Sequence, residues 1–349
     1  MLQIARRSLP IFPRKQCGIG FSFARFASNA ATGVNSSQPI SGDVNIKSEA
    51  NRLEKTLTKF WDKVETSFNK KTQSFETHLD GKALKTPLGN ILSVPANKKQ
   101  LAYLVSHEWE NLIDLKIKPN SLPLTSMVAR ATDLGIVFGS EEVDKDLVTK
   151  VGDLQDIKYN ILRYLDTDTC LIFTTLDEYE GRLRNKQEEL YRPLIEEFES
   201  YFTEFGRKKD LLPSPDHKVE LTYLDCETDG IRGNSQTITT QNIVLLWLDS
   251  LPIYDLVALE KAVLSSKSFL CGAAIVRSNA SDSQIQSELY QVNKANEAEY
   301  FKKSVEEIVE MGNLETIFQT QEWGEVEDTH DVDNADWLRS LSSAALVCR

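Results

Sequence analysis

Residues 75–87 read FETHLDGKALKTP, and this stretch predicts the hairpin around which the first part of the chain folds. Residues 75–79 alternate as a half-buried strand does, and the Asp80-Gly81 pair suits a type I′ turn because both turn positions need positive φ. Residues 83–86 would form the returning strand, and residues 91–94 a third strand. Three short strands of this kind make a small antiparallel sheet that needs a helix over one face.

The residues on either side of this sheet predict helices. Upstream, apolar side chains fall at helical spacing over residues 53–64, and we expect ordered structure to begin there. Downstream of Pro95, apolar residues recur at intervals of three and four over residues 101–112, so this helix would cover the sheet. A proline-rich link over residues 118–125 ends this part of the chain.

Helical periodicity dominates the remainder of the sequence. Helices are expected at residues 147–165, 176–205, 236–250, 256–275 and 284–323. One strand is expected where Val219, Leu221 and Tyr223 alternate. The predicted fold class is therefore α+β. A small N-terminal α+β domain over residues 51–135, with short antiparallel strands and a covering helix, would precede a larger all-helical C-terminal domain over residues 136–349.

The composition excludes several classes of protein. The 349 residues include 40 Lys and Arg against 52 Asp and Glu, a net charge of −12, which argues against non-specific binding of nucleic acid. The longest apolar runs, residues 243–248 and 269–276, fall far short of the roughly 20 residues that span a bilayer. We therefore expect a soluble globular protein without a membrane span.

The first residues of the chain have a composition of their own. Residues 1–26 contain five basic residues and no acidic one, with apolar side chains between the charges, as in a mitochondrial transit peptide. A basic tail without a targeting role is the alternative. Residues 27–50, rich in Ser, Asn, Ala and Gly, are expected to form a flexible leader.

Motifs that carry enzyme chemistry are missing from the sequence, including the phosphate loop, the dinucleotide fingerprint and the nucleophile elbow. His107-Glu108 begins like a zinc-protease helix, but Asn111 stands where a second His is needed. The pairs Asp166/Asp168 and Glu325/Glu327 could serve acid–base chemistry, although capping and solvated roles are commoner. We expect no catalytic residue, no metal and no cofactor.

The cysteines and histidines support the same expectation. The five cysteines form no C-x-x-C pair, and Cys170 and Cys271 lie in apolar surroundings that are typical of small buried side chains. The four histidines stand far apart in sequence. A histidine-based site would have to be assembled in three dimensions.

Several blocks of sequence, in chain order, carry a resemblance to a known family. They are FETHLDGKALKTP (75–87), EW (108–109), LPLTSMVAR (122–130), LRYLDTDT (162–169), GRLRNKQ (181–187), KSF (267–269), LETIFQ (314–319) and WGE (323–325). Together they resemble the mitochondrial assembly chaperones of the F(1)-ATPase alpha subunit, in their fungal form. The resemblance covers about residues 52–340, and the polar stretch between Val276 and Leu314 departs from it.

The resemblance implies a binding protein without catalytic activity. Such a protein would act in the mitochondrial matrix as a monomer and hold newly imported alpha subunit in soluble form until beta subunit completes the hexamer. An extended surface with reversible affinity is what such a task needs, because an isolated ring subunit exposes apolar interfaces. Two other functions stay open: a matrix enzyme with a dispersed active site, and a structural subunit of a matrix complex.

The resemblance also indicates where the partner would bind. The family carries a functionally important Glu in its L-E-x-x-[FY]-Q block, which here falls on Glu315. Helical spacing places Leu314 and Phe318 on one face and Glu315 and Gln319 on the neighbouring face. The predicted partner-binding residues are Glu315, Phe318, Gln319 and Trp323, with a solvated role for Glu315 and core packing for Trp323 as alternatives.

Three arginines, Arg130, Arg163 and Arg182, also lie in family blocks. Because carboxylates are abundant in this chain, we expect all three to form internal ion pairs rather than partner contacts.

Overall fold

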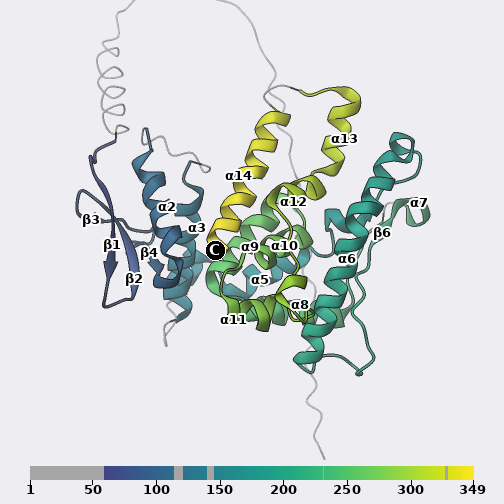
Figure 1. The fold of residues 1–349 in the computed structure, drawn as a ribbon, viewed down its shortest axis with the longest axis horizontal. Coiled ribbons are helices and arrows are strands. Elements are labelled where there is room, and N and C mark those ends of the chain that lie inside the picture. Colours follow the sequence, from purple (N-terminus) through teal and green to yellow (C-terminus); the bar gives the residue numbers. More distant parts are fainter. Residues whose placement is uncertain (1–58, 114–120, 140–144, 231, 327–328) are drawn as a thin grey trace, which may run out of the picture. The chain divides into compact units, whose positions relative to one another are not determined.

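The computed structural model describes residues 59–113, 121–139, 145–230, 232–326 and 329–349 (Figure 1). The transit peptide and the leader predicted for residues 1–26 and 27–50 lie outside the described residues, as does the start of order expected near Leu53.

The first part of the described chain is a small sheet with β2 (Ser74–Leu79) at its centre. β2 pairs antiparallel with its three neighbours: β1 (Val64–Asn69), β3 (Lys82–Ala83) and β4 (Ser93–Pro95). Between β2 and β3, Asp80 and Gly81 have φ angles of 47° and 79°, the positive values that a type I′ turn requires. The hairpin predicted from the sequence is confirmed, although its returning strand is shorter than residues 83–86.

The helix predicted over residues 53–64 is wrong where the structure describes it, because β1 begins at Val64. Every residue of β1 pairs with one of β2, and the Phe68 ring lies 4.9 Å from that of Phe75. Cross-strand pairing of this kind outweighs the helical spacing of a few apolar residues. Trp61, which fitted that spacing, is instead buried before the strand, with its ring 5.3 Å from that of Trp109.

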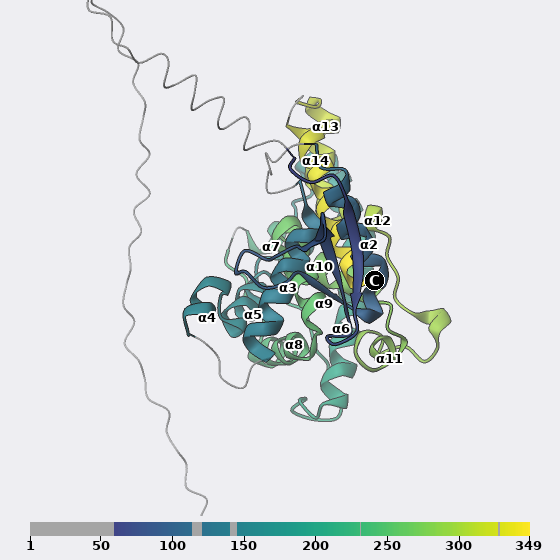
Figure 2. The same cartoon turned by 90° about the vertical axis from the view of Figure 1, so that its left-hand side faces the viewer.

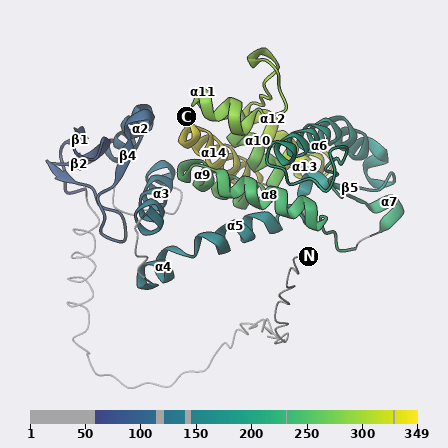
Figure 3. The ribbon, with the colours of Figure 1, turned by 90° about the horizontal axis from the view of Figure 1, so that it is seen from below.

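Two helices lie between the sheet and the rest of the molecule. α2 (Lys99–Glu110) packs on β1 and β2 and confirms the predicted covering helix. α3 (Pro123–Gly139) starts within the predicted link, with Pro123 at the helix start where its missing N–H costs nothing. Figure 3 shows α3 between the sheet and the helices that follow.

Glu108 of α2 fixes the start of α3. Its carboxylate accepts hydrogen bonds from the backbone N–H groups of Leu124 and Thr125, both 2.8 Å, and from the Thr125 hydroxyl. Glu108 and residues 124–125, which lie in two of the sequence blocks that carry the family resemblance, therefore have a structural role: Glu108 caps the start of α3.

The remainder of the described chain is mainly helical, as predicted. Its helices are α4 (Lys145–Val151), α5 (Leu154–Arg163), α6 (Arg182–Lys208), α7 (Cys226–Asp229), α8 (Ile238–Ser250), α9 (Ile253–Ser266), α10 (Phe269–Asn279), α11 (Ser283–Ile285), α12 (Val305–Gly312), α13 (Leu314–Trp323) and α14 (His330–Cys348).

Some of the predicted helices are divided. The helix expected at 147–165 breaks at Gly152, where φ is +96°, so that α4 and α5 follow one another as two helices (Figure 2). The helix expected at 256–275 breaks at Lys267, with φ +55°, and the Ser268 side chain caps α10. Both breaks lie at residues in the left-handed region, which ends a helix.

The strand predicted at Val219, Leu221 and Tyr223 is wrong. The backbone N–H groups of Val219 and Leu221 donate to the side chains of Thr203 and Glu199 on α6, at 2.8 Å each, so they bind a helix rather than a sheet. The short strand β6 (Leu224–Asp225) follows and pairs in parallel with β5 (Ile172–Phe173).

One core unites the described residues. The buried side chains of Val94 in the sheet and Leu92 beside it belong to the same cluster as those of α10 and α14. Lys98 donates to the backbone carbonyls of Val347 and Cys348, both at 2.9 Å, and the Tyr254 hydroxyl donates to the Ser93 carbonyl. The predicted division between residues 135 and 136 falls inside α3, with this core shared across it.

The polar stretch after Val276 is anchored by a buried charge. Arg277 is fully buried, donates from Nε to the carbonyl of Tyr290 at 2.7 Å, and pairs with Glu197 at 3.0 Å. Its guanidinium lies 3.8 Å from the centre of the Tyr201 ring. Residues 289–292 of the segment between α10 and α12 are thus buried, in spite of the polar composition of the segment as a whole.

No helix within the described ranges is both long enough and apolar enough to cross a membrane.

Candidate partner-binding site

α13 carries the four residues predicted to bind a partner. Its first residue, Leu314, is buried, and Phe318 packs against the core from the same face. The preceding Gly312 lies so close to the Trp337 ring of α14 that a Cβ there would meet it at 2.7 Å. The Tyr191 hydroxyl of α6 donates to the carbonyl of Met311 at 2.9 Å, so the start of α13 is held from two sides.

The polar face of α13 lies as predicted. Glu315 and Gln319 are one turn apart, and the Gln319 amide donates to the Glu315 carboxylate at 3.1 Å. Trp323, at the end of the helix, is 75% exposed and therefore does not take the core position that was its alternative. Trp is among the side chains most enriched at the hot spots of protein–protein interfaces, and here it lies exposed at the end of a packed helix.

An unusual turn faces this end of α13. Tyr179 and Glu180 have φ angles of 51° and 56°, and Gly181 follows with 77°, so three consecutive residues are left-handed before α6 begins. For the two non-glycine residues this conformation costs about 1 kcal/mol or more each. Hydrogen bonds hold it: Arg182 Nε donates to the Tyr179 carbonyl at 3.2 Å, and the Thr174 hydroxyl donates to Glu178.

The turn brings the Tyr179 ring against α13. The ring centre lies 5.8 Å from that of Phe318 in an edge-to-face arrangement and 6.0 Å from that of Trp323. Arg182 reaches across to Glu322 on α13 at 2.9 Å. The two elements, 140 residues apart in sequence, are therefore joined by aromatic contacts and one ion pair.

Between them lies a hollow of about 510 Å³, which we name the Tyr179 cleft. It is lined by Asp177, Glu178, Tyr179, Glu180, Arg182, Glu315, Gln319, Glu322 and Trp323. Five carboxylates and one guanidinium face this space. Three of the four predicted residues, Glu315, Gln319 and Trp323, line the cleft, and Phe318 supports it from the core side.

The pKa of Tyr179 reports the electrostatics of the cleft. Partial burial, together with the nearby carboxylates of Glu315, Glu178 and Glu322, raises the pKa of its hydroxyl above the ordinary value. These carboxylates repel a phenolate, so the cleft favours positive charge.

The sequence did not single out residues 177–180. Its only local signal is the GRLRNKQ block that begins at Gly181, the one glycine of the turn. The positive φ of Tyr179 and Glu180 leaves no trace in residue type, because neither residue favours it.

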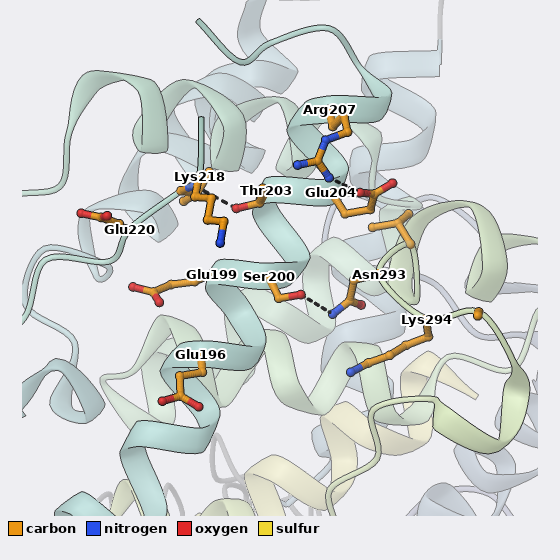
Figure 4. A pocket seen from close by; sticks show the side chains of 13 residues that line it. Glu196, Glu199, Ser200, Thr203, Glu204, Arg207, Lys218, Glu220, Asn293 and Lys294 are labelled. Atoms are coloured by element: carbon orange, nitrogen blue, oxygen red, sulfur yellow. Dashed lines mark hydrogen bonds and ion pairs between the residues drawn. The ribbon is translucent and has the colours of Figure 1, made fainter. Parts of the chain in front are cut away.

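A larger hollow, of about 670 Å³, lies between α6 and residues 218–220 and 292–295 (Figure 4). Both signs of charge line it, and some of its groups pair with one another. Arg207 pairs with Glu204, the Asn293 amide donates to Ser200, and Thr203 accepts the N–H of Val219. None of the four predicted partner-binding residues lines this hollow.

The arginines divide in their behaviour. Arg130 pairs with Glu260 through two hydrogen bonds of 2.6 and 2.8 Å, and Arg182 pairs with Glu322, as predicted. Arg163 is exposed and takes part in none of the ion pairs found among the described residues, so the prediction is wrong for this residue. It borders a third hollow, together with Asn160, Asp166 and Glu260.

The carboxylates considered for acid–base work serve as caps. Asp168 is fully buried and accepts from the N–H groups of Cys170 and Leu270 at 2.9 and 2.8 Å, and burial raises its pKa to about 6. Asp166 accepts from the N–H of Gln236 at 2.8 Å. Glu325 is exposed, and its predicted partner Glu327 lies outside the described residues.

The cysteines of the described residues lie outside the Tyr179 cleft. Cys170 and Cys271 are buried as predicted, with their Sγ atoms 3.6 Å apart. The hydrogen bond between the two thiols, together with burial, raises the pKa of Cys170 well above its ordinary value. Across the ranges that the structure describes, no three His, Cys, Asp or Glu side chains come together as metal ligands.

Comparisons with known proteins place this arrangement in context. Residues 58–199 match the model of the ATP12 chaperone protein family. The mitochondrial protein ATP12 of Saccharomyces cerevisiae is 42% identical over 315 residues, which cover 89% of this chain and 90% of that protein. The mitochondrial protein atp12 of Schizosaccharomyces pombe is 32% identical over 296 residues, covering 84% and 83%.

Solved structures share the fold. The crystal structure of Atp12 from Paracoccus denitrificans superposes with a TM-score of 0.54 at 19% identity, covering 84% of this chain and 99% of that one. The Atu1473 protein from Agrobacterium tumefaciens gives a TM-score of 0.56 at 20% identity, covering 83% and 84%. The predicted α+β class, with short strands before a mainly helical part, is confirmed.

Proposed function

This chain belongs to the ATP12 chaperone family, and from that premise we propose that it binds the alpha subunit of the mitochondrial F(1)-ATPase and prevents its aggregation until beta subunit joins. As a member of this family the chain is an assembly chaperone and not an enzyme. We place its action in the mitochondrial matrix, as a monomer that leaves once the F(1) sector of the ATP synthase is complete.

The observation that carries this proposal is the surface of α13. Trp323 is 75% exposed beside the Tyr179 cleft, while Phe318 and Leu314 fix the helix to the core. A large aromatic side chain held on a rigid element loses little entropy on binding and anchors an interface well. Glu315 and Gln319, on the neighbouring face, would orient the partner through charge and hydrogen bonds.

The mechanism needs binding alone. An unassembled ring subunit exposes apolar interfaces that drive aggregation, and a protein that covers them shifts the equilibrium towards soluble subunit by mass action. The sequence carries no phosphate loop, so we expect no ATP to be consumed.

Light scattering by isolated alpha subunit tests the proposal. Suppression of aggregation is expected to saturate near one chaperone per subunit without ATP, and added beta subunit should displace the chaperone if both cover the same surface. Suppression at strongly substoichiometric amounts would contradict a stoichiometric holdase. A stable complex of chaperone, alpha and beta would contradict the shared surface.

The Glu315→Lys variant tests the site. Charge reversal in the partner surface should weaken binding of alpha subunit about tenfold or more while the thermal midpoint of the chaperone stays near that of the wild type. Glu110→Lys is the matched control, because Glu110 is an exposed Glu at the end of α2, far along the chain from the cleft. Equal binding by both variants would remove Glu315 from the site.

A further inference from the structure

We propose that the Tyr179 cleft receives an arginine side chain of the client, with the guanidinium against the rings of Tyr179 and Trp323 and in ion pairs with Glu180 and Glu315. This inference rests on the proposed function and names the chemistry by which the client is recognised.

The first reason is the imbalance of charge in the cleft. Its lining has five carboxylates and one guanidinium, and that guanidinium, of Arg182, is already paired with Glu322 at 2.9 Å. Among the described residues, no cation pairs with Asp177, Glu180 or Glu315, and Glu315 accepts only the neutral amide of Gln319. A partner that enters this space is favoured if it brings positive charge.

The second reason is the aromatic wall. Tyr179 and Trp323 stand with ring centres 6.0 Å apart, and three-quarters of Trp323 is exposed. The face of an aromatic ring attracts a cation, most strongly for Trp. Arginine suits this wall better than lysine, because its planar group stacks on a ring while its N–H groups pair with carboxylates at the edge.

The third reason is that two arginines of this chain are themselves held by aromatic rings together with a carboxylate. Arg192 lies 4.4 Å from the Phe173 ring and 4.2 Å from the Tyr223 ring, and its Nε donates to a carboxylate, that of Glu188, at 2.7 Å. Arg277 is likewise enclosed by the rings of Tyr201, Phe198 and Phe301, and pairs with Glu197.

The Tyr179 cleft repeats this combination of rings and carboxylates without a cation of its own over the rings. In the described part of the chain, neither Tyr179 nor Trp323 has a lysine or arginine stacked on it. The left-handed turn at residues 179–181 is held by internal hydrogen bonds, so the wall is in place before a partner arrives. Such preorganisation lowers the entropic cost of binding.

Binding of alpha subunit to full-length variants provides the first test. Tyr179→Gly removes the ring at a position where glycine accepts the positive φ without strain, so the turn should fold. Glu180→Gln removes one carboxylate charge, and Glu110→Gln is the control at an exposed site outside the cleft. We expect Tyr179→Gly to weaken binding about tenfold, with some loss of stability because its ring contacts Phe318. Glu180→Gln should weaken binding severalfold with an unchanged thermal midpoint, and Glu110→Gln should have no effect.

A competition experiment identifies the side chain. Acetyl-arginine amide at millimolar concentration should displace alpha subunit from the wild-type chaperone, whereas acetyl-citrulline amide, its neutral counterpart, should not at the same ionic strength. The Tyr179→Gly variant should lose this difference. Equal effects of the two compounds on the wild type would overturn the assignment of arginine.

The outcomes separate this inference from the function on which it rests. If the wild-type chaperone does not bind alpha subunit at all, the proposed function fails. If the wild type binds and both cleft variants bind equally well, the function stands and the arginine site is overturned.

Discussion

At the scale of single residues, Arg277 is a charged side chain that the fold buries completely. Its guanidinium is fully buried, and desolvation lowers its pKa despite the nearby Glu197 and Tyr201. Three aromatic rings, the Tyr290 carbonyl and the Glu197 carboxylate replace part of the lost water, while Nη1 is buried without a hydrogen-bond partner among the described residues. A buried charge of this kind is tolerated only while its partners stay in place.

Removal of this charge should therefore be costly. We expect Arg277→Ala to lower the free energy of unfolding by about 3–5 kcal/mol, because Glu197 loses a buried partner and a cavity opens among the rings. Arg207→Ala removes an exposed pair with Glu204 and should cost less than about 1 kcal/mol. Urea unfolding of both variants measures the difference, and equal losses would show that the aromatic enclosure contributes nothing.

Asp168 should give stability a distinct pH dependence. Burial raises its pKa from 3.8 to about 6 in the folded chain, so between these values the folded state binds more protons than the unfolded state. Stability contributed by the protonated acid is complete below about pH 4 and is lost as the pH rises through 6, a change of about 3 kcal/mol. Relative to Asp168→Asn, which does not titrate, the wild type should lose stability between pH 4 and pH 6. Parallel stability profiles for the two proteins would refute the buried acid.

The sequence predicted part of the candidate site, namely the residues on α13. Spacing alone places Glu315 and Gln319 on one helix face and Phe318 on the next, and the structure has them there. Tyr179 and Glu180 were not predicted because their role depends on an αL backbone that their side chains do not prefer. The exposure of Trp323 was open for a different reason, since Trp is common both in cores and at interfaces.

At the scale of elements, helical periodicity predicted α2 but missed α3 and α14. α2, with apolar residues on one face, was predicted. α3 has nine buried residues spread around most of its surface, so no polar stripe marks it, and it begins with a proline inside an apparent link. α14 packs on α9, and four of its seven buried residues are Ala or Ser, which carry little hydrophobic signal.

The junction of α12 and α13 depends on a close approach that only glycine allows. A Cβ at Gly312 would meet the Trp337 ring at 2.7 Å, so Gly312→Ala must displace α14 or α13 and should cost about 1–3 kcal/mol. Gly135→Ala, in α3, meets nothing within 4 Å and should instead stabilise by about 0.5–1 kcal/mol through helix propensity. Thermal unfolding gives both signs. A Gly312→Ala variant with the stability of the wild type would mean that α12 and α14 are not packed as closely as described.

At the scale of the whole molecule, the fold class followed from the sequence, whereas the division into two domains stays a prediction. The strand and helix signals differ on either side of α3, and a boundary at residue 135 was inferred from that change. Burial is not visible in such local patterns. Leu92 near the sheet and Val347 at the end of α14 belong to one cluster, joined further by Lys98.

This shared core predicts how the molecule unfolds. Because α3 packs on β4, α2, α9 and α14, loss of the helical part would expose the apolar side of the sheet, whose few short strands are not stable alone. Hydrogen exchange at increasing urea should therefore show β2 and α10 losing protection at the same midpoint. Protection in α10 that persists after β2 has exchanged would instead identify residues 51–135 as an independently unfolding domain. In that case the contacts of Lys98 and Tyr254 across α3 would contribute little to cooperativity, and substitution of either residue by Ala should leave both midpoints where they were.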